Sequence, residues 1–272
     1  MTSEAPDRET PRDYRIAAVD RAVSVVEALA EEPAQGVTAL AERLGLTKSI
    51  VFRILRTLEG RGVVVRDPDR AEYSLGFRMS LLGERASRQD GLLFAARPIM
   101  DDLQEATGEN VNLVVRDGAR TMVIATREGR HSMRLFAHAG RHGPLHAGGG
   151  SQLLLAFAPA ELRRAVLAGP LERYTPHTIT DPSALARRLE RIVEQGWNVA
   201  LDDLDEGAFS VAAPIRGIGR EVVAAISVAG AVARLDEERR HRNLDAARTA
   251  GERISRSLVS GPSEPARSGA GA

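Results

Sequence analysis

The chain has 272 residues, of which 43% are hydrophobic, and its 37 basic and 37 acidic side chains give a formal net charge of zero. That length suits two domains with a hydrophobic core each, and the balanced charge argues against a protein that coats nucleic acid over its whole surface. Cysteine is absent, which excludes disulfides, thiol nucleophiles and cysteine-ligated zinc.

The two ends of the sequence are polar or rich in small residues. Residues 1–14 and 261–272 are therefore predicted to be disordered tails. No apolar run predicts a membrane helix or a secretory signal, so we expect a cytoplasmic protein with no membrane partner. Between the tails the sequence predicts a first domain at 15–77, a linker and dimerisation helix at 78–91 and a second domain at 92–260.

The first domain has the pattern of a helix-turn-helix. Apolar residues at helical spacing predict a first helix that includes Val19 and Leu29. A short second helix over residues 38–44 ends at Gly45, and a third begins at Thr47, whose hydroxyl is expected to accept a hydrogen bond from a first-turn amide. The aliphatic side chains of the third helix gather on one face, which leaves Ser49, Phe52, Arg53 and Arg56 on the other.

Positive charge is concentrated in this part of a neutral chain. From Arg43 to Arg66 there are six basic residues and a single acid, Glu59, which gives the segment a local charge of +5. Such an excess favours contact with phosphates. Taken alone, the third helix would also suit a solvated surface helix with no nucleic-acid partner.

The residues after the third helix favour DNA recognition. Val63–Val65 is predicted to be a strand, Asp67–Asp69 a turn and Glu72–Leu75 the returning strand. A hairpin directly after a recognition helix is a wing, and its basic tip would lie along the DNA backbone or minor groove. The sequence thus predicts a winged helix-turn-helix whose candidate DNA contacts are Thr47, Lys48, Ser49, Phe52, Arg53, Arg56, Arg66 and Arg70.

The second domain mixes helices with alternating segments. A linker helix over 77–89 carries Leu81 and Leu82 but little else that is apolar, which suits a helix that packs against another subunit. Strands on both sides of a helical insert predict an α+β fold with an antiparallel sheet rather than a parallel βαβ fold. The predicted strands are 111–115, 121–125, 133–136, 198–201, 210–215 and 222–229, and the predicted helices are 92–107, 152–157, 160–167, 183–195 and 236–259.

A glycine-rich loop over residues 140–156 leads into a helix. Glycines let the backbone approach a ligand, and the first unpaired amides of the helix then attract negative charge, so the loop suits a small carboxylate. A flexible turn with no ligand is the alternative. The loop matches neither a Walker sequence nor a dinucleotide fingerprint.

The same region does not predict catalysis or a metal site. Ser151, His146 and Asp202 could be combined as a hydrolase triad, but the second glycine of a nucleophile elbow is missing. The histidines between 131 and 146 match no zinc spacing and are expected on the surface of a loop. The acidic run over 202–206 is expected to be solvated. We therefore predict no catalytic residue, no metal and no cofactor.

Nine short motifs occur in an order that resembles the isocitrate lyase regulator (IclR) family of bacterial transcription factors, and the resemblance covers residues 17–258. The motifs are Asp20–Val23, Gly45–Ser49, Phe52–Leu55, Leu58–Gly62, Tyr73–Gly76, Gly140–Ala147, Gly196–Trp197, Val211–Ile215 and Ala225–Val228.

The resemblance implies a winged helix-turn-helix, a dimerising linker helix and a C-terminal effector-binding domain with a six-stranded sheet related to GAF sensors. It also implies homodimers or dimers of dimers that repress or activate catabolic operons in response to small organic acids, aromatic acids or quorum-type molecules. The positions that the resemblance and the loop assign to the effector are Leu135, Leu145, His146, Gly149, Gly150, Leu154, Ser210 and Ser227.

Two departures from the family pattern concern the ligand. Many members have Gly-Lys where this chain has Ser151-Gln152, and Ala200 and Ala229 replace an acid and a serine of relatives that bind small keto acids. The pocket is therefore expected to be less polar and to take a larger or more apolar ligand than glyoxylate or pyruvate. The predicted function is a transcriptional regulator that binds an operator in double-stranded DNA and responds to a carboxylate or aromatic effector. The alternative is a ligand-binding or enzymatic GAF-like protein whose helical head does not read DNA.

Overall fold

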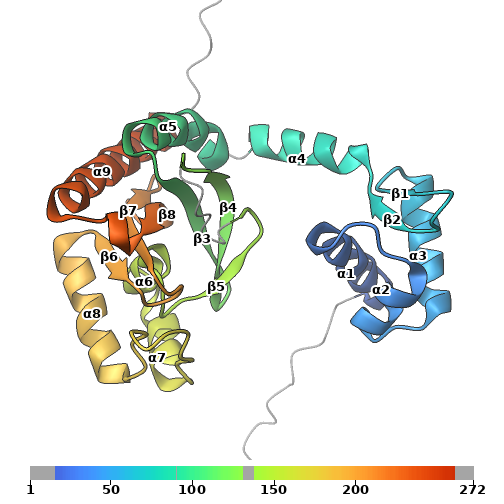
Figure 1. The fold of residues 1–272 in the computed structure, drawn as a ribbon, viewed down its shortest axis with the longest axis horizontal. Coiled ribbons are helices and arrows are strands. Elements are labelled where there is room, and N and C mark those ends of the chain that lie inside the picture. Colours follow the sequence, from blue (N-terminus) through green and yellow to red (C-terminus); the bar gives the residue numbers. More distant parts are fainter. Residues whose placement is uncertain (1–15, 90, 131–137, 261–272) are drawn as a thin grey trace, which may run out of the picture. The chain divides into compact units, whose positions relative to one another are not determined.

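The computed structural model describes residues 16–89, 91–130 and 138–260. The chain divides into two compact units, residues 1–86 and 87–272, which are taken separately below. None of the described helices is long and apolar enough to cross a membrane. The predicted α+β class is confirmed, with a helix-turn-helix unit followed by a unit built on an antiparallel sheet (Figure 1).

The N-terminal unit has the predicted winged arrangement. Helices α1 (Ala17–Glu31), α2 (Val37–Leu44) and α3 (Lys48–Gly60) are followed by the hairpin of β1 (Val64–Arg66) and β2 (Tyr73–Leu75), and then by α4 (Phe77–Gln89). Leu29, Leu40, Val51, Leu55 and Tyr73 form its fully buried centre.

Two local predictions about the ends of helices in this unit are confirmed. Gly45 ends α2 with a φ of 63°, and the Thr47 hydroxyl accepts a hydrogen bond from the Ile50 amide at 3.4 Å. The sequence did not reveal that Gln35 pairs with Tyr73 through two backbone hydrogen bonds, which attach the loop before α2 to the hairpin.

The C-terminal unit is an antiparallel six-stranded sheet between two helical layers. The strand order is β5-β4-β3-β8-β7-β6. The strands are β3 (Asn110–Asp117), β4 (Arg120–Arg127), β5 (His142–Pro144), β6 (Asn198–Leu201), β7 (Ala208–Arg216) and β8 (Val222–Ala231), and the helices are α5 (Gly91–Thr107), α6 (Gly149–Ala156), α7 (Ala160–Ala168), α8 (Pro182–Gln195) and α9 (Glu237–Ser260). The predicted strand at 133–136 lies outside the described residues, and the short edge strand β5 was not predicted.

The alternation of side chains along the strands places the polar residues on one face of the sheet. Val111 and Leu113 of β3 pack toward α5 and α9, whereas Val114 packs toward α6. Asn112 therefore faces the α6 side, where the register pairs it with Ser227 of β8. This face meets the first turn of α6.

Candidate functional site

Helix α3 buries one face and leaves the other open. Val51 and Leu55 have no exposed surface, whereas Lys48, Ser49, Arg53 and Arg56 are exposed and Phe52 keeps 50% of its surface accessible. The 3.6-residue period of the helix produces this division. Phe52 thus keeps half of its surface open on the same face as the basic residues.

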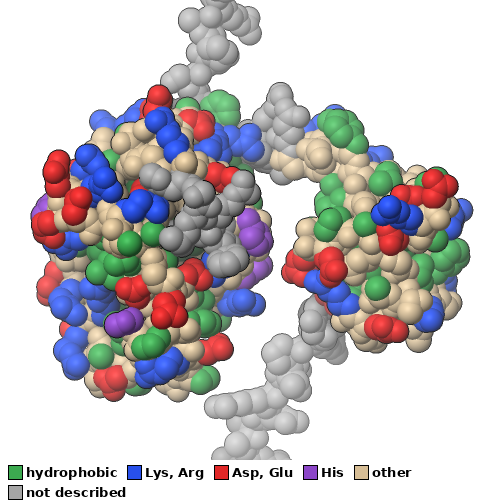
Figure 2. All heavy atoms as spheres, in the orientation of Figure 1, with side chains coloured by type: hydrophobic (Ala, Val, Ile, Leu, Met, Phe, Trp, Pro, Cys, Tyr) green, Lys and Arg blue, Asp and Glu red, His purple; other side chains and the backbone are tan. Residues whose placement is uncertain are grey.

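Two of the basic side chains of this unit are paired with acids. Arg56 forms an ion pair with Glu59 at 2.7 Å, and Arg43 is held by Glu31 and Glu32 of α1. The predicted charge of +5 therefore overstates the free positive charge, because the two acids of α1 lie outside the segment that was counted. On the face of the unit visible in Figure 2, basic and acidic side chains are interspersed.

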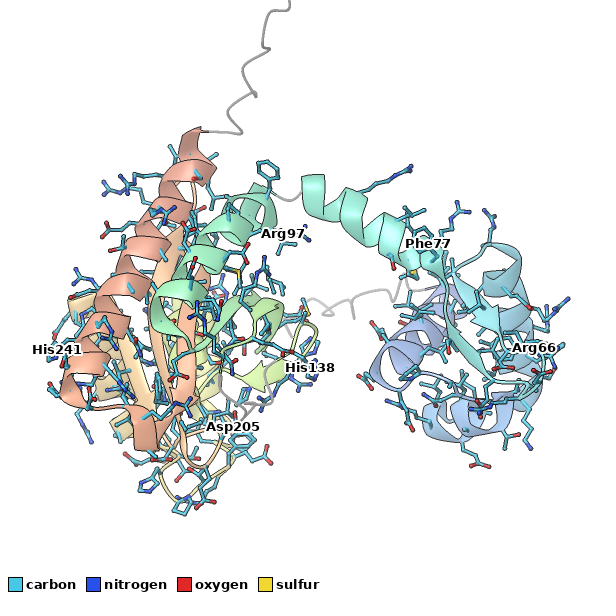
Figure 3. The ribbon with its side chains drawn as sticks, turned by 45° about the horizontal axis from the view of Figure 1, so that its top comes forward. Arg66, Phe77, Arg97, His138, Asp205 and His241 are labelled. Carbon is cyan, nitrogen blue, oxygen red and sulfur yellow. The ribbon has the colours of Figure 1, made fainter. Side chains whose placement is uncertain are left out.

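Four candidate DNA contacts keep their charge free. Among the described residues, Lys48, Arg53, Arg66 and Arg70 form no ion pair. Figure 3 shows Arg66 on the outside of the unit, at the end of β1. The wing turn beside it is held by the Asp67 carboxylate, which accepts hydrogen bonds from two amides of the turn.

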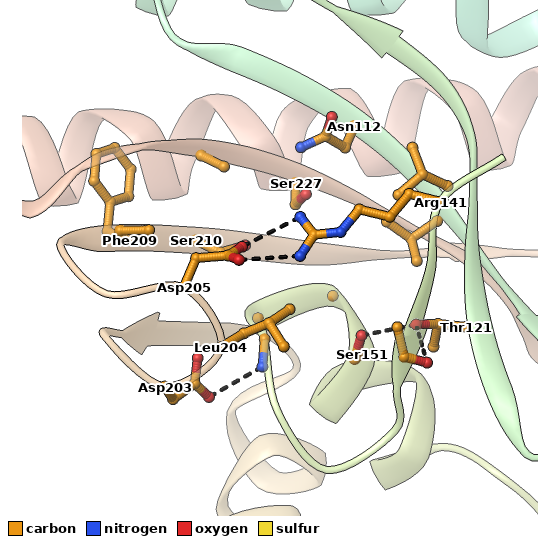
Figure 4. A pocket seen from close by; sticks show the side chains of 18 of the residues that line it. Asn112, Thr121, Arg141, Ser151, Asp203, Leu204, Asp205, Phe209, Ser210 and Ser227 are labelled. Atoms are coloured by element: carbon orange, nitrogen blue, oxygen red, sulfur yellow. Dashed lines mark hydrogen bonds and ion pairs between the residues drawn. The ribbon is translucent and has the colours of Figure 1, made fainter. Parts of the chain in front are cut away.

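The C-terminal unit contains a cavity of about 100 Å³ on the polar face of its sheet (Figure 4). Strands β3, β7 and β8 form one wall, and the first turn of α6 forms another. By the same measure a cavity needs roughly 10–15 Å³ to hold one water molecule, so this space is several times larger and suits a small organic molecule. The apolar part of the lining is Val114, Val123, Leu204, Ala208, Phe209 and Ala229.

Unpaired polar groups line this cavity although they are buried. Ser227 is 3% exposed, and its hydroxyl has no hydrogen-bond partner among the described residues. Asn112 is 4% exposed and accepts one hydrogen bond from the Thr126 hydroxyl at 3.1 Å, which leaves its amide group without an acceptor in the described structure. Buried polar groups without partners are costly, so these two side chains are available for hydrogen bonds to a molecule, water or ligand, that fills the cavity.

The start of α6 lies unusually close to the sheet. A Cβ atom added to Gly149 would lie 2.6 Å from the Ser210 carbonyl oxygen, so only glycine permits this approach. Gly148 before it has a φ of 90°, which also favours glycine. The amides of Gly149, Gly150 and Ser151 line the cavity and donate to no atom of the described residues.

The loop between β6 and β7 supplies two carboxylates with different surroundings. Asp203 is 9% exposed and accepts hydrogen bonds from the Gly148 amide at 3.1 Å and the Gln152 side chain at 2.9 Å. Asp205 is half-buried and pairs with the Arg141 guanidinium. The prediction that the whole acidic run is solvated is therefore wrong for Asp203, because it lies under the first turn of α6.

The predicted effector residues fall into three groups. Gly149, Gly150, Ser210 and Ser227 all line the cavity. Leu145 and His146 line an adjoining groove beside Tyr174, which shares Arg141 and Asp205 with the cavity. The buried His146 ring bonds to the Glu172 carbonyl oxygen at 2.8 Å. His146 is thus not the surface histidine that the loop predicted.

The two remaining leucines do not belong to the described lining. Leu154 is a core residue, 2% exposed, on the inner side of α6. Leu135 lies outside the described residues.

Sequence reasoning missed seven polar residues of the described lining: Asn112, Thr121, Arg141, His142, Ser151, Asp203 and Asp205. A single asparagine inside the apolar run of β3 was the available signal for Asn112. Nothing in the sequence pairs Arg141 with Asp205, because 63 residues separate them along the chain. Thr121 bonds to Ser151 at 3.0 Å, which joins β4 to α6.

Burial predicts a pH dependence for Asp203. Loss of hydration raises the pKa of the Asp203 carboxyl, although the Gly148 hydrogen bond and the charge of Arg188 oppose the rise. The folded protein therefore holds this proton more tightly than the unfolded chain does. This preference for the proton stabilises the folded state in full at a pH below the ordinary aspartate pKa. The stabilisation is lost as the pH rises through the raised pKa, and it amounts to about 1.4 kcal/mol of unfolding free energy for each unit by which the pKa is raised.

We expect Asp203→Asn to become more stable relative to the wild type as the pH rises from about 4 to 8. Urea unfolding followed by the fluorescence of Trp197, the only tryptophan, measures this in the C-terminal unit. Glu206→Gln is the matched control, because Glu206 is exposed and has no hydrogen bond among the described residues. Parallel curves for the wild type and Asp203→Asn would contradict the prediction.

Comparison with known proteins identifies both units. Residues 85–256 match the family described as "Bacterial transcriptional regulator IclR C-terminal", and residues 18–68 match the "IclR helix-turn-helix domain". The HTH-type transcriptional regulator BhcR of Paracoccus denitrificans (strain Pd 1222) is 34% identical over 241 residues, which cover 88% of this chain and 86% of BhcR. The HTH-type transcriptional repressor AllR of Salmonella typhi is 31% identical over 224 residues, which cover 82% of each chain.

Solved structures agree with these sequence matches. The IclR transcriptional regulator from Alicyclobacillus acidocaldarius matches 90% of this chain and all of its own length with a TM-score of 0.84 at 27% identity. An IclR homolog from Microbacterium hydrocarbonoxydans, complexed with 4-hydroxybenzoate, matches 90% of this chain and all of its own length with a TM-score of 0.82 at 28% identity. These relatives are named as regulators of transcription rather than as enzymes. The chain belongs to the IclR family of helix-turn-helix transcriptional regulators.

Proposed function

We propose that this regulator binds a palindromic operator through α3 and the wing, and that a small organic effector in the cavity changes its affinity for that operator. The effector is a carboxylate or an aromatic compound, and the regulated genes form a catabolic operon. One observation carries the proposal. A cavity against the sheet holds buried polar groups that have no partner among the described residues, in a chain whose helix-turn-helix unit presents cations with no ion pair in the described structure.

The lining of the cavity supports this class of effector. Val114, Val123 and Leu204 offer apolar walls, while Ser227, Asn112 and the α6 amides offer hydrogen bonds. Free amides at a helix N-terminus attract negative charge, and the two buried side chains supply independent evidence for a polar ligand. The relative from Microbacterium hydrocarbonoxydans is named as a complex with 4-hydroxybenzoate, which has both an aromatic ring and a carboxylate.

The DNA contacts are proposed from exposure and charge. Arg53 is exposed and forms no ion pair with any described residue, so it is free to contact a guanine edge or a phosphate. Lys48, Ser49 and the exposed Phe52 share its face of α3, and Arg66 and Arg70 follow the wing. Thr47 caps α3 and presents its exposed side chain beside the same face. Arg56 can contact DNA only after its ion pair with Glu59 has broken.

We expect Arg53→Ala to weaken operator binding by about 1–3 kcal/mol if Arg53 contacts a base. The effect of Arg56→Ala is expected to be smaller because its ion pair with Glu59 is lost on binding. Fluorescence anisotropy measures the operator affinity of both variants. The probe is the DNA upstream of the regulator's own gene, titrated across a salt series and against scrambled competitor. Arg164→Ala, an exposed cation of α7, is the control. Unchanged affinity in both α3 variants would exclude this helix as the reader.

We expect Ser227→Val to weaken the response to the effector without changing operator binding in its absence. The substitution replaces a buried hydroxyl at the cavity with one methyl group and adds a second. Titration of operator complexes with 4-hydroxybenzoate and a panel of small carboxylates should show that the variant needs at least about tenfold more of the active compound. Ser183→Val, exposed on α8, is the control. Superimposable titrations of Ser227→Val and the wild type would refute the cavity as the effector site.

We propose that the regulator assembles as a homodimer or a dimer of dimers through α4. Phe77 is 74% exposed, and Leu81 and Leu82 are also exposed on this helix. Light scattering should give two or four times the chain mass of 29.3 kDa. Leu81→Glu combined with Leu82→Glu should lower that mass, whereas Leu201→Glu at an exposed position of β6 should not. A wild-type mass of one chain would contradict the assembly.

A further inference from the structure

The described lining of the cavity contains one guanidinium group, and an aspartate side chain is already bound to it. Among the described residues that line the cavity, Arg141 is the only one with a permanent positive charge. Its two terminal nitrogens bond to the two oxygens of Asp205 at 3.0 Å and 3.3 Å. Figure 4 shows the guanidinium reaching across the cavity between Ser227 and Asp205. An arginine binds a ligand carboxylate with this same two-pronged geometry.

The two partners of this ion pair are held differently. The Arg141 backbone is fixed by a hydrogen bond from the Val123 amide at 2.9 Å, which attaches it to β4. Asp205 lies in the loop between β6 and β7, and its carboxylate has no partner other than Arg141 in the described structure. Asp203 in the same loop differs, because two donors hold its carboxylate and neither belongs to Arg141.

The exposure of the ion pair makes it weak enough to exchange. The side chains of Arg141 and Asp205 are 27% and 30% exposed, so water screens their attraction. A ligand carboxylate inside the cavity would compete for the same nitrogens while its apolar body contacts Val114, Val123 and Leu204. The competing carboxylate therefore gains contacts that Asp205 does not make.

We propose that Arg141 is the carboxylate-binding residue of the effector cavity, and that Asp205 is an internal competitor that the effector carboxylate displaces. The inference rests on the proposed function, because it assigns a residue and a ligand class to the same cavity. The class is a monocarboxylate with an apolar or aromatic body. A second carboxylate would face Asp203 and the displaced Asp205, and no further permanent cation lines the described part of the cavity.

Calorimetry with benzoate and its neutral analogue benzamide tests this on the full-length protein. We expect Asp205→Asn to bind benzoate about fivefold more tightly or better than the wild type, because the competitor loses its charge. Arg141→Gln should bind benzoate at least about tenfold more weakly. Benzamide should bind the wild type and Asp205→Asn equally, since it has no carboxylate.

A matched control separates this effect from a general loss of charge. Arg127 and Asp101 form another ion pair between a strand and a neighbouring element, away from the cavity lining. Asp101→Asn should therefore bind benzoate like the wild type. Thermal melting followed by Trp197 fluorescence establishes that each variant is folded, and Asp205→Asn alone decides the question if Arg141→Gln unfolds.

The outcomes distinguish this inference from the proposed function. Failure of Asp205→Asn to bind benzoate more tightly than the wild type, including the absence of any binding, would overturn the role of Arg141 and Asp205. If Ser227→Val weakens benzoate binding while Asp205→Asn and Arg141→Gln match the wild type, the cavity is the effector site and only the present inference fails. If benzoate binds and all three variants match the wild type, neither the cavity as the effector site nor the roles of Arg141 and Asp205 hold for this ligand.

Discussion

The close approach of α6 to β7 determines the place of the cavity that we propose as the effector site. Because Gly149 has no Cβ, the first turn of the helix lies against the backbone of Ser210, at a separation that any side chain would prevent. The first residues of the helix then line the cavity, and their amides have no partner among the described residues. The position and the polarity of the cavity depend on this contact.

The loop between β6 and β7 shows how burial gives different properties to neighbouring acids. Asp203 lies beneath α6, where lost hydration raises its pKa and two hydrogen bonds keep it in place. Asp205, two residues further, stays partly hydrated and is tied only to Arg141 among the described residues. One carboxylate is therefore part of the support of the helix, and the other is available for exchange with a ligand.

In the N-terminal unit, the surface available to DNA depends on which cations are already paired. Arg43 and Arg56 are bound to acids, whereas Lys48, Arg53, Arg66 and Arg70 keep their charge free in the described structure. Specific base contacts and general attraction to phosphates thus depend on fewer side chains than the composition indicates. The neutral net charge of the whole chain agrees with a local, rather than general, affinity for DNA.

The sequence by itself determined the elements whose signals are local. The period of the apolar residues in α3, the cap at Thr47, the glycine that ends α2 and the turn at Asp67 each depend on neighbouring residues, and each is present as predicted. The class of the C-terminal sheet also followed from the order of strands and helices.

Only the tertiary structure decided the cavity. Asn112, Thr121, Arg141, Asp205 and Ser227 lie on different strands and loops, and their partners are set by strand register and by the contact of α6 with the sheet. Burial separated Leu154 and Asp203 from their predicted surroundings, because the local sequence does not specify what another element will cover.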